Sequence, residues 1–332
     1  MGQNHRNVYK DYHKIFSVST ESFEGLALEI FRYQARSNPV YAEFVSALGI
    51  DPEKIREITA IPFLPIRFFK TSGLIVEGAH AEKVFESSGT TGMQHSKHLV
   101  ADLSLYEESF TRCFELFYGP VTNWCVIGLL PSYLERSNSS LVYMTSHLIT
   151  ASGHPDSGFY LDDLDRLMQK LKELEKAGQP VWLIGVSFAL LDLAEKFPMK
   201  LDHTLILETG GMKGRREELI RPELHDRLMK AFHKKCIHSE YGMTELLSQS
   251  YSKGEGVFNS PPWMKILLRD AEDPFHLLEK GRGTINVIDL ANIHSCSFIA
   301  TDDTGSVKED GSFELWGRVD GSDLRGCSLL IA

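Results

Sequence analysis

Apolar residues recur at helical spacing near the start of the chain. Between residues 23 and 31 they share one face, behind Ser and Thr residues that suit a helix N-cap. Asn38-Pro39 suits the end of this helix, since proline does not continue one. The same spacing predicts a second helix over residues 104–117, whereas two prolines among apolar residues predict an extended segment over residues 60–73.

Beyond residue 120, short apolar runs alternate with helical patterns. The runs that resemble strands are NWCVIGLLP, PVWLIGV, HTLILETGG and CIHSEYGMTE. The helical patterns cover residues 161–174, 187–197 and 215–235. This order predicts an α/β fold with a largely parallel sheet covered by helices on both faces. Ligands then bind beyond the carboxyl ends of strands, here in the loops GLLPSY, ETGGMKGR and SEYGMTE.

The pattern changes near the end of the chain. From Lys265 onward, short β-patterned pieces such as KILLRD, GTINVIDL and SFELWGR are separated by Gly and Asp turns. We therefore predict two domains. Residues 1–262 form an α/β core with an N-terminal helical segment, and residues 263–332 form a β-rich subdomain.

Charge and composition exclude several classes of protein. The 35 Lys and Arg residues are outnumbered by 45 Asp and Glu residues, and a net charge of −10 argues against nucleic acid as the main partner. The N-terminus is polar, and no run approaches the roughly 20 apolar residues of a membrane span. We therefore expect a cytoplasmic protein without integral membrane contact.

The five cysteines show neither a C-x-x-C pair nor spacing typical of metal ligands, which argues against a zinc site and a disulfide scaffold. Cys125 lies in an apolar run and is typical of a buried core residue. Cys327 lies among small and polar residues close to Arg325, and a nearby cation favours the reactive thiolate. Cys327 is therefore a candidate nucleophile.

Six small residues in a row, SSGTTG, follow the apolar pair Val84-Phe85. Hydroxyls and exposed backbone N–H groups suit an anion such as phosphate, and glycine lets the main chain approach it closely. Taken alone, the run is explained equally well by an ordinary surface loop. It does not match the G-x-x-x-x-G-K-[ST] pattern, because Lys97 comes five residues after Gly92 and His98 follows it.

Together with YGMTE and ATDDTGSVKEDGSFELWGRVDG downstream, this run resembles the adenylate-forming superfamily from about Phe85 to the C-terminus. Enzymes of this superfamily join a carboxylate to ATP and pass the acyl group to a thiol. The resemblance implies a large α/β domain with mostly parallel sheets flanked by helices, plus a small C-terminal β subdomain. ATP and Mg²⁺ are the implied cofactors.

The resemblance assigns roles to particular residues. Thr244 would bind phosphate, Glu245 would hold Mg²⁺, and either Lys97 or His95 would add positive charge near the phosphates. Asp303 would accept hydrogen bonds from the ribose. The implied nucleotide-binding residues are Ser87, Ser88, Gly89, Thr90, Thr91, Gly92, Gly210, Gly211, Tyr241, Gly242, Asp303 and Arg318. The implied catalytic residues are Cys327, Lys97, Thr244 and Glu245, and the implied hinge residue is Asp320.

This chain also departs from the superfamily pattern. MQHSK replaces the usual proline and lysine after the glycine-rich loop, so Lys97 is only an approximate equivalent, and Asp302 replaces a glycine. Typical members continue after the hinge into a mobile domain with a catalytic lysine. Only twelve residues follow Asp320 here, so we expect that domain to be absent.

A shorter branch is similar in this respect: the acyl-protein synthetases of bacterial fatty-acid reductase, the LuxE family. GLLPSYLERSNSSLVYM and GRVDGSDLRGCSLL resemble its sequence. The resemblance implies an ATP-dependent synthetase that makes acyl-AMP from a carboxylic acid, with a fatty acid as the expected substrate. The acyl group would pass to Cys327 as a thioester for a reductase or acyltransferase partner.

Two alternatives remain open at this stage. A phenylacetate-type ligase would transfer the acyl group to coenzyme A, which the expected absence of the C-terminal domain disfavours. A non-catalytic homologue that only binds nucleotide or acyl groups would fit the departures after Gly92. Tyr241, Glu245 and Asp303, which match the superfamily motifs, argue against it.

Overall fold

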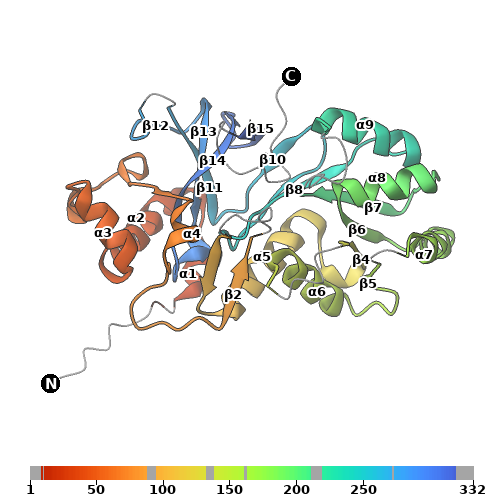
Figure 1. Cartoon of the computed structure of the whole chain (residues 1–332), viewed down its shortest axis with the longest axis horizontal. Helices are drawn as coiled ribbons and strands as arrows, with labels where there is room; N and C mark the ends of the chain where they lie inside the picture. Colours follow the sequence, from red (N-terminus) through yellow and green to blue (C-terminus); the bar gives the residue numbers. More distant parts are fainter. Residues whose placement is uncertain are drawn as a thin grey trace. The chain divides into compact units, whose positions relative to one another are not determined.

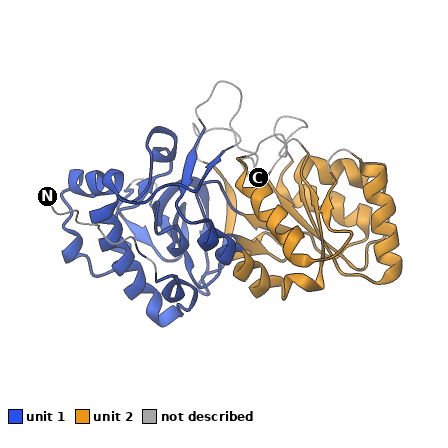
Figure 2. Ribbon diagram, turned by 90° about the horizontal axis from the view of Figure 1, so that it is seen from below, with its two compact units in different colours: residues 1–110, 242–249, 260–313 blue, residues 111–241, 250–259, 314–332 orange. Residues whose placement is uncertain are grey.

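The computed structural model describes residues 9, 11–87, 95–131, 138–160, 163–210, 219–270 and 273–318. The chain forms two compact packing units, each built from segments far apart in the sequence (Figure 2). Unit 1 comprises residues 1–110, 242–249 and 260–313, and unit 2 comprises residues 111–241, 250–259 and 314–332. These units are groups of segments that pack together. The predicted division into two domains at residue 262 stays a prediction.

Unit 1 begins with helices. They are α1 (Tyr12–Phe16), α2 (Thr20–Ser37), α3 (Pro39–Ala47), η1 (Pro52–Lys54), η2 (Ile58–Ala60) and α4 (Phe68–Thr71). The predicted first helix is confirmed as α2, which starts with a capping box between Ser19 and Ser22. Asn38 ends α2 and its side chain also caps α3. The segment over residues 60–73 is not wholly extended, because it includes α4.

An antiparallel sheet forms the centre of unit 1 (Figure 1). Its strands occur in the order β12 (Leu277–Leu278), β11 (Met264–Arg269), β13 (Gly281–Asp289) and β14 (Phe298–Val307). The short β1 (Leu64–Pro65) adds a parallel pairing to β14. Phe298 of β14 contacts Phe31 of α2 and Tyr41 of α3, with ring centroids 6.0 and 6.1 Å apart. The N-terminal helices are thereby packed on this sheet.

Two further elements complete unit 1. β2 (Lys83–Glu86) and β3 (Lys97–Val100) form a separate antiparallel hairpin. η4 (Leu290–Asn292) follows β13 directly. The division between the units falls within α5 (Leu103–Tyr118), which confirms the predicted second helix.

Unit 2 contains a mixed sheet. Its order is β15 (Phe313–Arg318), β10 (Val257–Asn259), β9 (Ser250–Ser252), β8 (His238–Tyr241), β7 (Thr204–Thr209), β6 (Val181–Val186), β4 (Cys125–Leu129) and β5 (Gly158–Phe159). Pairings are parallel from β8 to β5 and antiparallel between β8, β9 and β10. The prediction of a largely parallel sheet therefore holds for one part of the fold, because β9 and β10, downstream of Tyr241, pair antiparallel.

Helices cover both faces of the parallel strands (Figure 1). They are α6 (Ser140–Ser152), α7 (Leu164–Ala177), α8 (Ser187–Lys196) and α9 (Arg221–Phe232), with η3 (Val121–Asn123) before β4. Leu171, Leu190 and Leu228 place α7, α8 and α9 in one core with Ile127 of β4. On the other face α6 lies so close that a Cβ at Gly128 would be 3.1 Å from Thr145 Cγ2.

The last predicted helix of unit 2 is shorter than expected. The pattern predicts a helix over residues 215–235, whereas α9 covers Arg221–Phe232, and residues 215–218 lie outside the described part. Pro222 occupies the first turn, where a missing backbone N–H costs least. His233 adopts a left-handed conformation with φ 52° and ends the helix. Charged residues on either side of α9 made the predicted helix longer than the observed one.

A buried glutamine generates a prediction about the stability of unit 1. Gln34 of α2 donates from Nε2 to the carbonyl oxygens of Asn292 (3.0 Å) and Ile293 (2.8 Å) and accepts from Ser297 N (3.0 Å). Gln34→Leu leaves these backbone groups without that partner, so the free energy of unfolding should fall by at least about 2 kcal/mol. Urea denaturation measures it. Gln169→Leu, the same change at an exposed glutamine, should have little effect, and equal losses would contradict the assignment.

Candidate functional site

The SSGTTG run is the loop of the β2–β3 hairpin in unit 1. Ser87, the first residue of the run, accepts from Ser96 N through Oγ (2.9 Å) and donates its own N–H to Ser96 O (3.0 Å). His95 Nδ1 lies 2.6 Å from the Ser87 carbonyl oxygen. These contacts close the hairpin at Ser87 and Ser96. The remaining residues of the run, Ser88 to Gly92, lie outside the described residues.

Lys97 lies on the solvent side of this hairpin. Its Nζ is 3.7 Å from Glu86 Oε1, and its side chain is 59% exposed. His98, the next residue, points the opposite way, as alternate residues of a strand do, and is fully buried. His95 is half-buried and closer to the start of the loop. A role for Lys97 or His95 at a phosphate stays a prediction.

The segment carrying Thr244 and Glu245 is fixed to unit 1 through its backbone. His98 Nδ1 lies 2.7 Å from the Thr244 carbonyl oxygen, and Asn292 Nδ2 donates to the Glu245 carbonyl oxygen at 2.7 Å. His98 Nε2 also lies 2.9 Å from Asn292 Oδ1. Burial lowers the pKa of His98, so the ring is neutral at pH 7. Because both of its partners are oxygen acceptors, the neutral ring donates to one of them at a time.

Asp289 anchors the residues that follow. Its fully buried carboxylate accepts from Leu247 N (2.8 Å), Ser248 N (3.0 Å), Ser248 Oγ (2.6 Å) and Ala291 N (3.2 Å). Burial raises the pKa of Asp289, and these hydrogen bonds act against that rise. The segment from Gly242 to Gln249 is therefore held at both Glu245 and Ser248, which suits a loop that must keep functional side chains in place.

Asp303, the predicted ribose acceptor, lies on β14 of the same unit and is 5% exposed. Its N–H donates to Thr301 Oγ1 at 3.2 Å. The positive charge of Arg269 lies close to Asp302 and Asp303. Arg269 is held in turn by Asn286 Oδ1 at 2.6 Å. Sequence reasoning missed Arg269, and its position in KILLRD offers no signal beyond a charge in an apolar strand.

In unit 2, predicted residues lie at the carboxyl ends of neighbouring parallel strands. Gly210 follows β7 with φ 75°, a conformation that favours glycine, and Tyr241 ends β8. Tyr241 is 6% exposed, and its ring centroid lies 6.3 Å from that of Phe258. Arg318 is half-buried at the end of β15. The predicted nucleotide-binding roles of Tyr241, Gly210 and Arg318 stay predictions.

A polar cluster that the sequence did not reveal lies at this edge of unit 2. Ser187 Oγ donates to Glu208 Oε1 at 2.8 Å, His225 Nε2 lies 3.9 Å from Glu208 Oε2, and Ser239 Oγ lies 3.2 Å from His225 Nε2. Burial raises the pKa of Glu208, but the nearby His225, the charge of Arg221 and the hydrogen bond from Ser187 outweigh it, so the net shift is downward. Glu208 therefore remains ionised.

Glu240 on the adjacent strand behaves in the opposite way. It accepts a hydrogen bond from Thr209 Oγ1, yet burial and then the charge of Glu208 raise its pKa from 4.5 to about 7. Two neighbouring carboxylates with separated pKa values are typical of functional sites. The only sequence signal was the position of both residues at strand ends beside Gly210 and Tyr241.

Three other predicted site residues are not among those that the structure describes. Gly211, Asp320 and Cys327 lie outside the described residues. Within the described ranges, no group of three or more His, Cys, Asp or Glu side chains has the arrangement of a metal site. Nor do those ranges contain a helix that combines the length and apolarity needed to cross a membrane.

No protein-family model matches the chain. Its sequence is similar to two long-chain-fatty-acid–luciferin-component ligases at 23% identity. The ligase of Vibrio harveyi aligns over 323 residues, 90% of this chain and 84% of the relative, and that of Aliivibrio fischeri over 346 residues, 96% and 89%. The predicted resemblance to LuxE-type acyl-protein synthetases is confirmed.

Solved structures support the predicted fold. An open conformation of 2-hydroxyisobutyryl-CoA ligase, in complex with 2-HIB-AMP and CoA, matches with a TM-score of 0.62 at 13% identity over 91% of this chain and 70% of that chain. ATP-bound MatB from Rhodopseudomonas palustris matches with a TM-score of 0.54 at 19% identity over 74% of this chain and 49% of that chain. The chain thus has the mixed α/β fold of adenylate-forming ligases and spans about half of the MatB chain.

The raised pKa of Glu240 predicts that the stability of the protein depends on pH. Glu240 has a folded-state pKa of about 7, above its ordinary value of 4.5. Ionisation of Glu240 therefore opposes folding, and the free energy of unfolding of the wild type should fall as the pH rises from 4.5 to about 7. Glu240→Gln keeps an oxygen for Thr209 and should be more stable than wild type by about 2 kcal/mol at pH 8, with little difference at pH 4. Thermal unfolding across this range is the measurement. Glu115→Gln, at an exposed glutamate of unit 2, should show no such trend, and a pH-independent Glu240→Gln difference would contradict the prediction.

Proposed function

We propose that this chain activates a fatty acid with ATP and transfers the acyl group to its own Cys327. In the first step a carboxylate oxygen attacks the α-phosphorus of ATP, the bond to the β-phosphate breaks, and acyl-AMP and pyrophosphate form. In the second step the Cys327 thiolate attacks the acyl carbon and AMP leaves with the bonding electrons. The product is a thioester that a partner enzyme consumes.

One observation carries this proposal: similarity to two long-chain-fatty-acid–luciferin-component ligases extends over 90% and 96% of this chain. A match of that extent includes residues of both packing units. The fold is consistent with it, since 2-hydroxyisobutyryl-CoA ligase aligns over 91% of the chain. Similarity of fold does not by itself establish an activity, so the residues must fit the chemistry.

The residues of unit 1 fit ATP and Mg²⁺. The loop after Ser87 offers hydroxyls and N–H groups for phosphates. Mg²⁺ is usually bound by one or two carboxylates together with substrate phosphates, which agrees with Glu245 as a single carboxylate ligand in a chain whose described residues hold no metal cluster. When bound, Mg²⁺ would neutralise phosphate charge. His98 and Asn292 hold the Thr244 and Glu245 backbone for this purpose.

Other residues would bind the remainder of the nucleotide. Asp303 offers a carboxylate to the ribose hydroxyls, and Arg318 would contact the same sugar. Tyr241 offers an aromatic face to adenine. Gly210 and Gly211 would let the backbone lie against the purine, in keeping with φ 75° at Gly210.

Transfer of the acyl group to Cys327 requires a reducing compartment and a partner protein. A reactive Cys327 needs a compartment that keeps thiols reduced, which supports the cytoplasm as its location. The thioester would be delivered to a protein partner, a reductase or an acyltransferase. Similarity to the luciferin-component ligases favours a reductase.

Exchange of labelled pyrophosphate into ATP tests the first step. Wild-type protein should catalyse this exchange in the presence of a fatty acid, and Glu245→Gln should slow it at least about tenfold, because a weaker Mg²⁺ ligand remains. Excess Mg²⁺ should restore part of the rate. Glu43→Gln, at an exposed glutamate of α3, serves as the matched control. A folded wild-type protein that shows no exchange with any fatty or aromatic acid would overturn the adenylation proposal.

Replacement of the proposed acceptor thiol tests the second step. Cys327→Ser should keep pyrophosphate exchange and lose the hydroxylamine-sensitive acyl group that intact mass spectrometry detects on wild-type protein. The reason is that a serine hydroxyl supplies almost no anionic nucleophile near neutral pH, whereas a thiol has a pKa near ~8.5. Cys236→Ser, at an exposed free cysteine, should retain the acyl group. Persistent acylation of Cys327→Ser, or rapid transfer to coenzyme A independent of Cys327, would replace this step with that of a coenzyme A ligase.

A further inference from the structure

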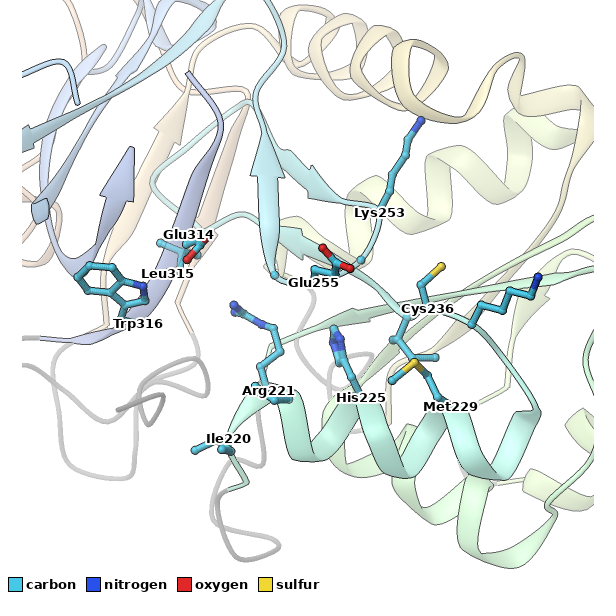
Figure 3. A pocket seen from close by; sticks show the side chains of 15 residues that line it. Ile220, Arg221, His225, Met229, Cys236, Lys253, Glu255, Glu314, Leu315 and Trp316 are labelled. Atoms are coloured by element: carbon cyan, nitrogen blue, oxygen red, sulfur yellow. The ribbon is translucent and has the colours of Figure 1, made fainter. Parts of the chain in front are cut away.

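Each unit contains an arginine, missed by the sequence motifs, whose charge acts on a buried carboxylate. In unit 2, Arg221 acts on Glu208 and lines a cavity of about 740 Å³ between α9, the turn from β9 to β10, and β15 (Figure 3). Glu255 and Glu314 line the same cavity, so its walls combine both signs of charge. In unit 1, Arg269 of β11 differs, because its guanidinium is hydrogen-bonded to oxygen atoms of two other strands.

β14 has a bulge at Asp303, the proposed ribose acceptor. Between the pairs Thr284 with Thr304 and Asn286 with Ala300, β14 has three residues where β13 has one. Asp303 is the last of these three. A bulge interrupts the regular ladder of backbone hydrogen bonds and changes the direction of the side chains that it carries. The direction of the Asp303 carboxylate therefore depends on what holds this bulge in shape.

Arg269 holds the bulge from β11. Its Nη1 donates to Ile285 O (3.2 Å) and to Asn286 Oδ1 (2.6 Å), and its Nη2 donates to Thr301 O. Thr301 Oγ1 donates to the same Ile285 oxygen (2.8 Å) and accepts from Asp303 N (3.2 Å). The guanidinium, the Thr301 hydroxyl and the Asp303 backbone therefore form one hydrogen-bond network across three strands.

Arginine has the geometry that this position requires. Its planar guanidinium donates several hydrogen bonds in fixed directions, whereas a lysine ammonium is a compact point charge on a flexible stem. Arginine also stays protonated in proteins, and the charge of Arg269 acts on Asp302 and Asp303. Arg269 therefore supplies both the hydrogen bonds that hold the bulge and a positive charge close to two carboxylates.

We propose that Arg269 is a positioning residue for nucleotide binding: it holds the β14 bulge so that the Asp303 carboxylate accepts hydrogen bonds from the ribose hydroxyls of ATP. This inference rests on the proposed function, because it takes Asp303 as the ribose acceptor, and deepens it by naming the residue that orients this acceptor. Arg269 acts through Asp303 rather than on the sugar. Its replacement should therefore weaken only the part of nucleotide binding that depends on the ribose hydroxyls.

Calorimetric titration with ATP and with 2′,3′-dideoxy-ATP, which lacks both ribose hydroxyls, measures this part directly. Wild type should bind ATP at least about tenfold more tightly than the dideoxy analogue, because hydrogen bonds to a charged acceptor are the stronger kind. Asp303→Ala should abolish this preference. Arg269→Lys should lower it several-fold and leave the affinity for the dideoxy analogue unchanged. Arg36→Lys, the same change at an exposed arginine of unit 1, should bind both nucleotides like wild type.

Thr301→Val tests the same bulge without changing the guanidinium. Valine has nearly the shape of threonine but no hydroxyl, so Asp303 N and Ile285 O both lose their contact with Oγ1. The preference for ATP over the dideoxy analogue should fall as it does in Arg269→Lys, and Thr301→Val supplies the test if Arg269→Lys does not fold. A wild-type preference in the folded variants, or equal losses for both nucleotides, would overturn the role of Arg269.

Pyrophosphate exchange separates this inference from the proposed function. If the preference for ATP depends on Asp303 and Arg269, yet wild type exchanges pyrophosphate with no acid, the inference stands and the adenylation proposal fails. If wild type exchanges pyrophosphate and Asp303→Ala abolishes the preference, yet folded Arg269→Lys and Thr301→Val keep it, the inference fails alone. If wild type binds both nucleotides equally, Asp303 is not the ribose acceptor and the inference fails with that assignment.

Discussion

The buried carboxylate of Asp289 is the interaction on which the candidate site of unit 1 depends. A buried carboxyl group is tolerated only when its polar atoms are hydrogen-bonded, and Asp289 accepts four hydrogen bonds, three of them from the Leu247–Ser248 turn. The same stretch of chain supplies Asn292, which holds the Glu245 carbonyl oxygen and contacts His98. Because Gln34 fixes the backbone of Asn292, the N-terminal helix α2 indirectly positions Glu245. The site therefore depends on a buried polar network rather than on its own loop alone.

Unit 2 meets a different constraint, that of a parallel sheet. Each crossover helix must start at the carboxyl edge of one strand and return to the amino edge of the next. The end of β7 thereby brings Gly210 to the edge where β8 delivers Tyr241. Glu208 and Glu240 lie beside each other at this edge, and their pKa values separate because His225 and Arg221 favour the Glu208 carboxylate whereas burial raises the pKa of Glu240. The same crossover places α9 on one face of these strands, so the candidate edge and the helix that packs behind it follow from one connection.

The sequence predicted those parts of the fold that depend on local patterns. α2, α5, β6 and α8 were found because apolar spacing and caps are written into consecutive residues. α6 was missed because Ser and Thr alternate with apolar residues in SLVYMTSHLITAS and hide its periodicity. Within the site, motif resemblance identified Glu245 and Asp303, but Asp289, Asn292 and Gln34 were not predictable. Gln34 forms hydrogen bonds with residues more than 250 positions away in the sequence. The residues next to Gln34 in the sequence therefore give no sign of its partners. The pKa of Glu240 likewise depends on a strand neighbour rather than on its own surroundings in the sequence.

The acyl acceptor depends on which thiol reaches acyl-AMP rather than on the fold. A solved structure with a similar fold is a CoA ligase with CoA bound, whereas the relatives in sequence are named for a luciferin component, so the acceptors in these names differ. Acyl-AMP is attacked by whichever thiolate reaches it. The effective concentration of each thiol therefore decides whether a cysteine of the protein or coenzyme A is acylated. A cysteine carried by the same chain is present at every turnover without a binding step, whereas coenzyme A must bind separately. An acyl group held on the protein is also kept from water until a partner arrives. A thioester on the same chain would then serve delivery as well as activation, because the hydrophobic product never has to dissociate.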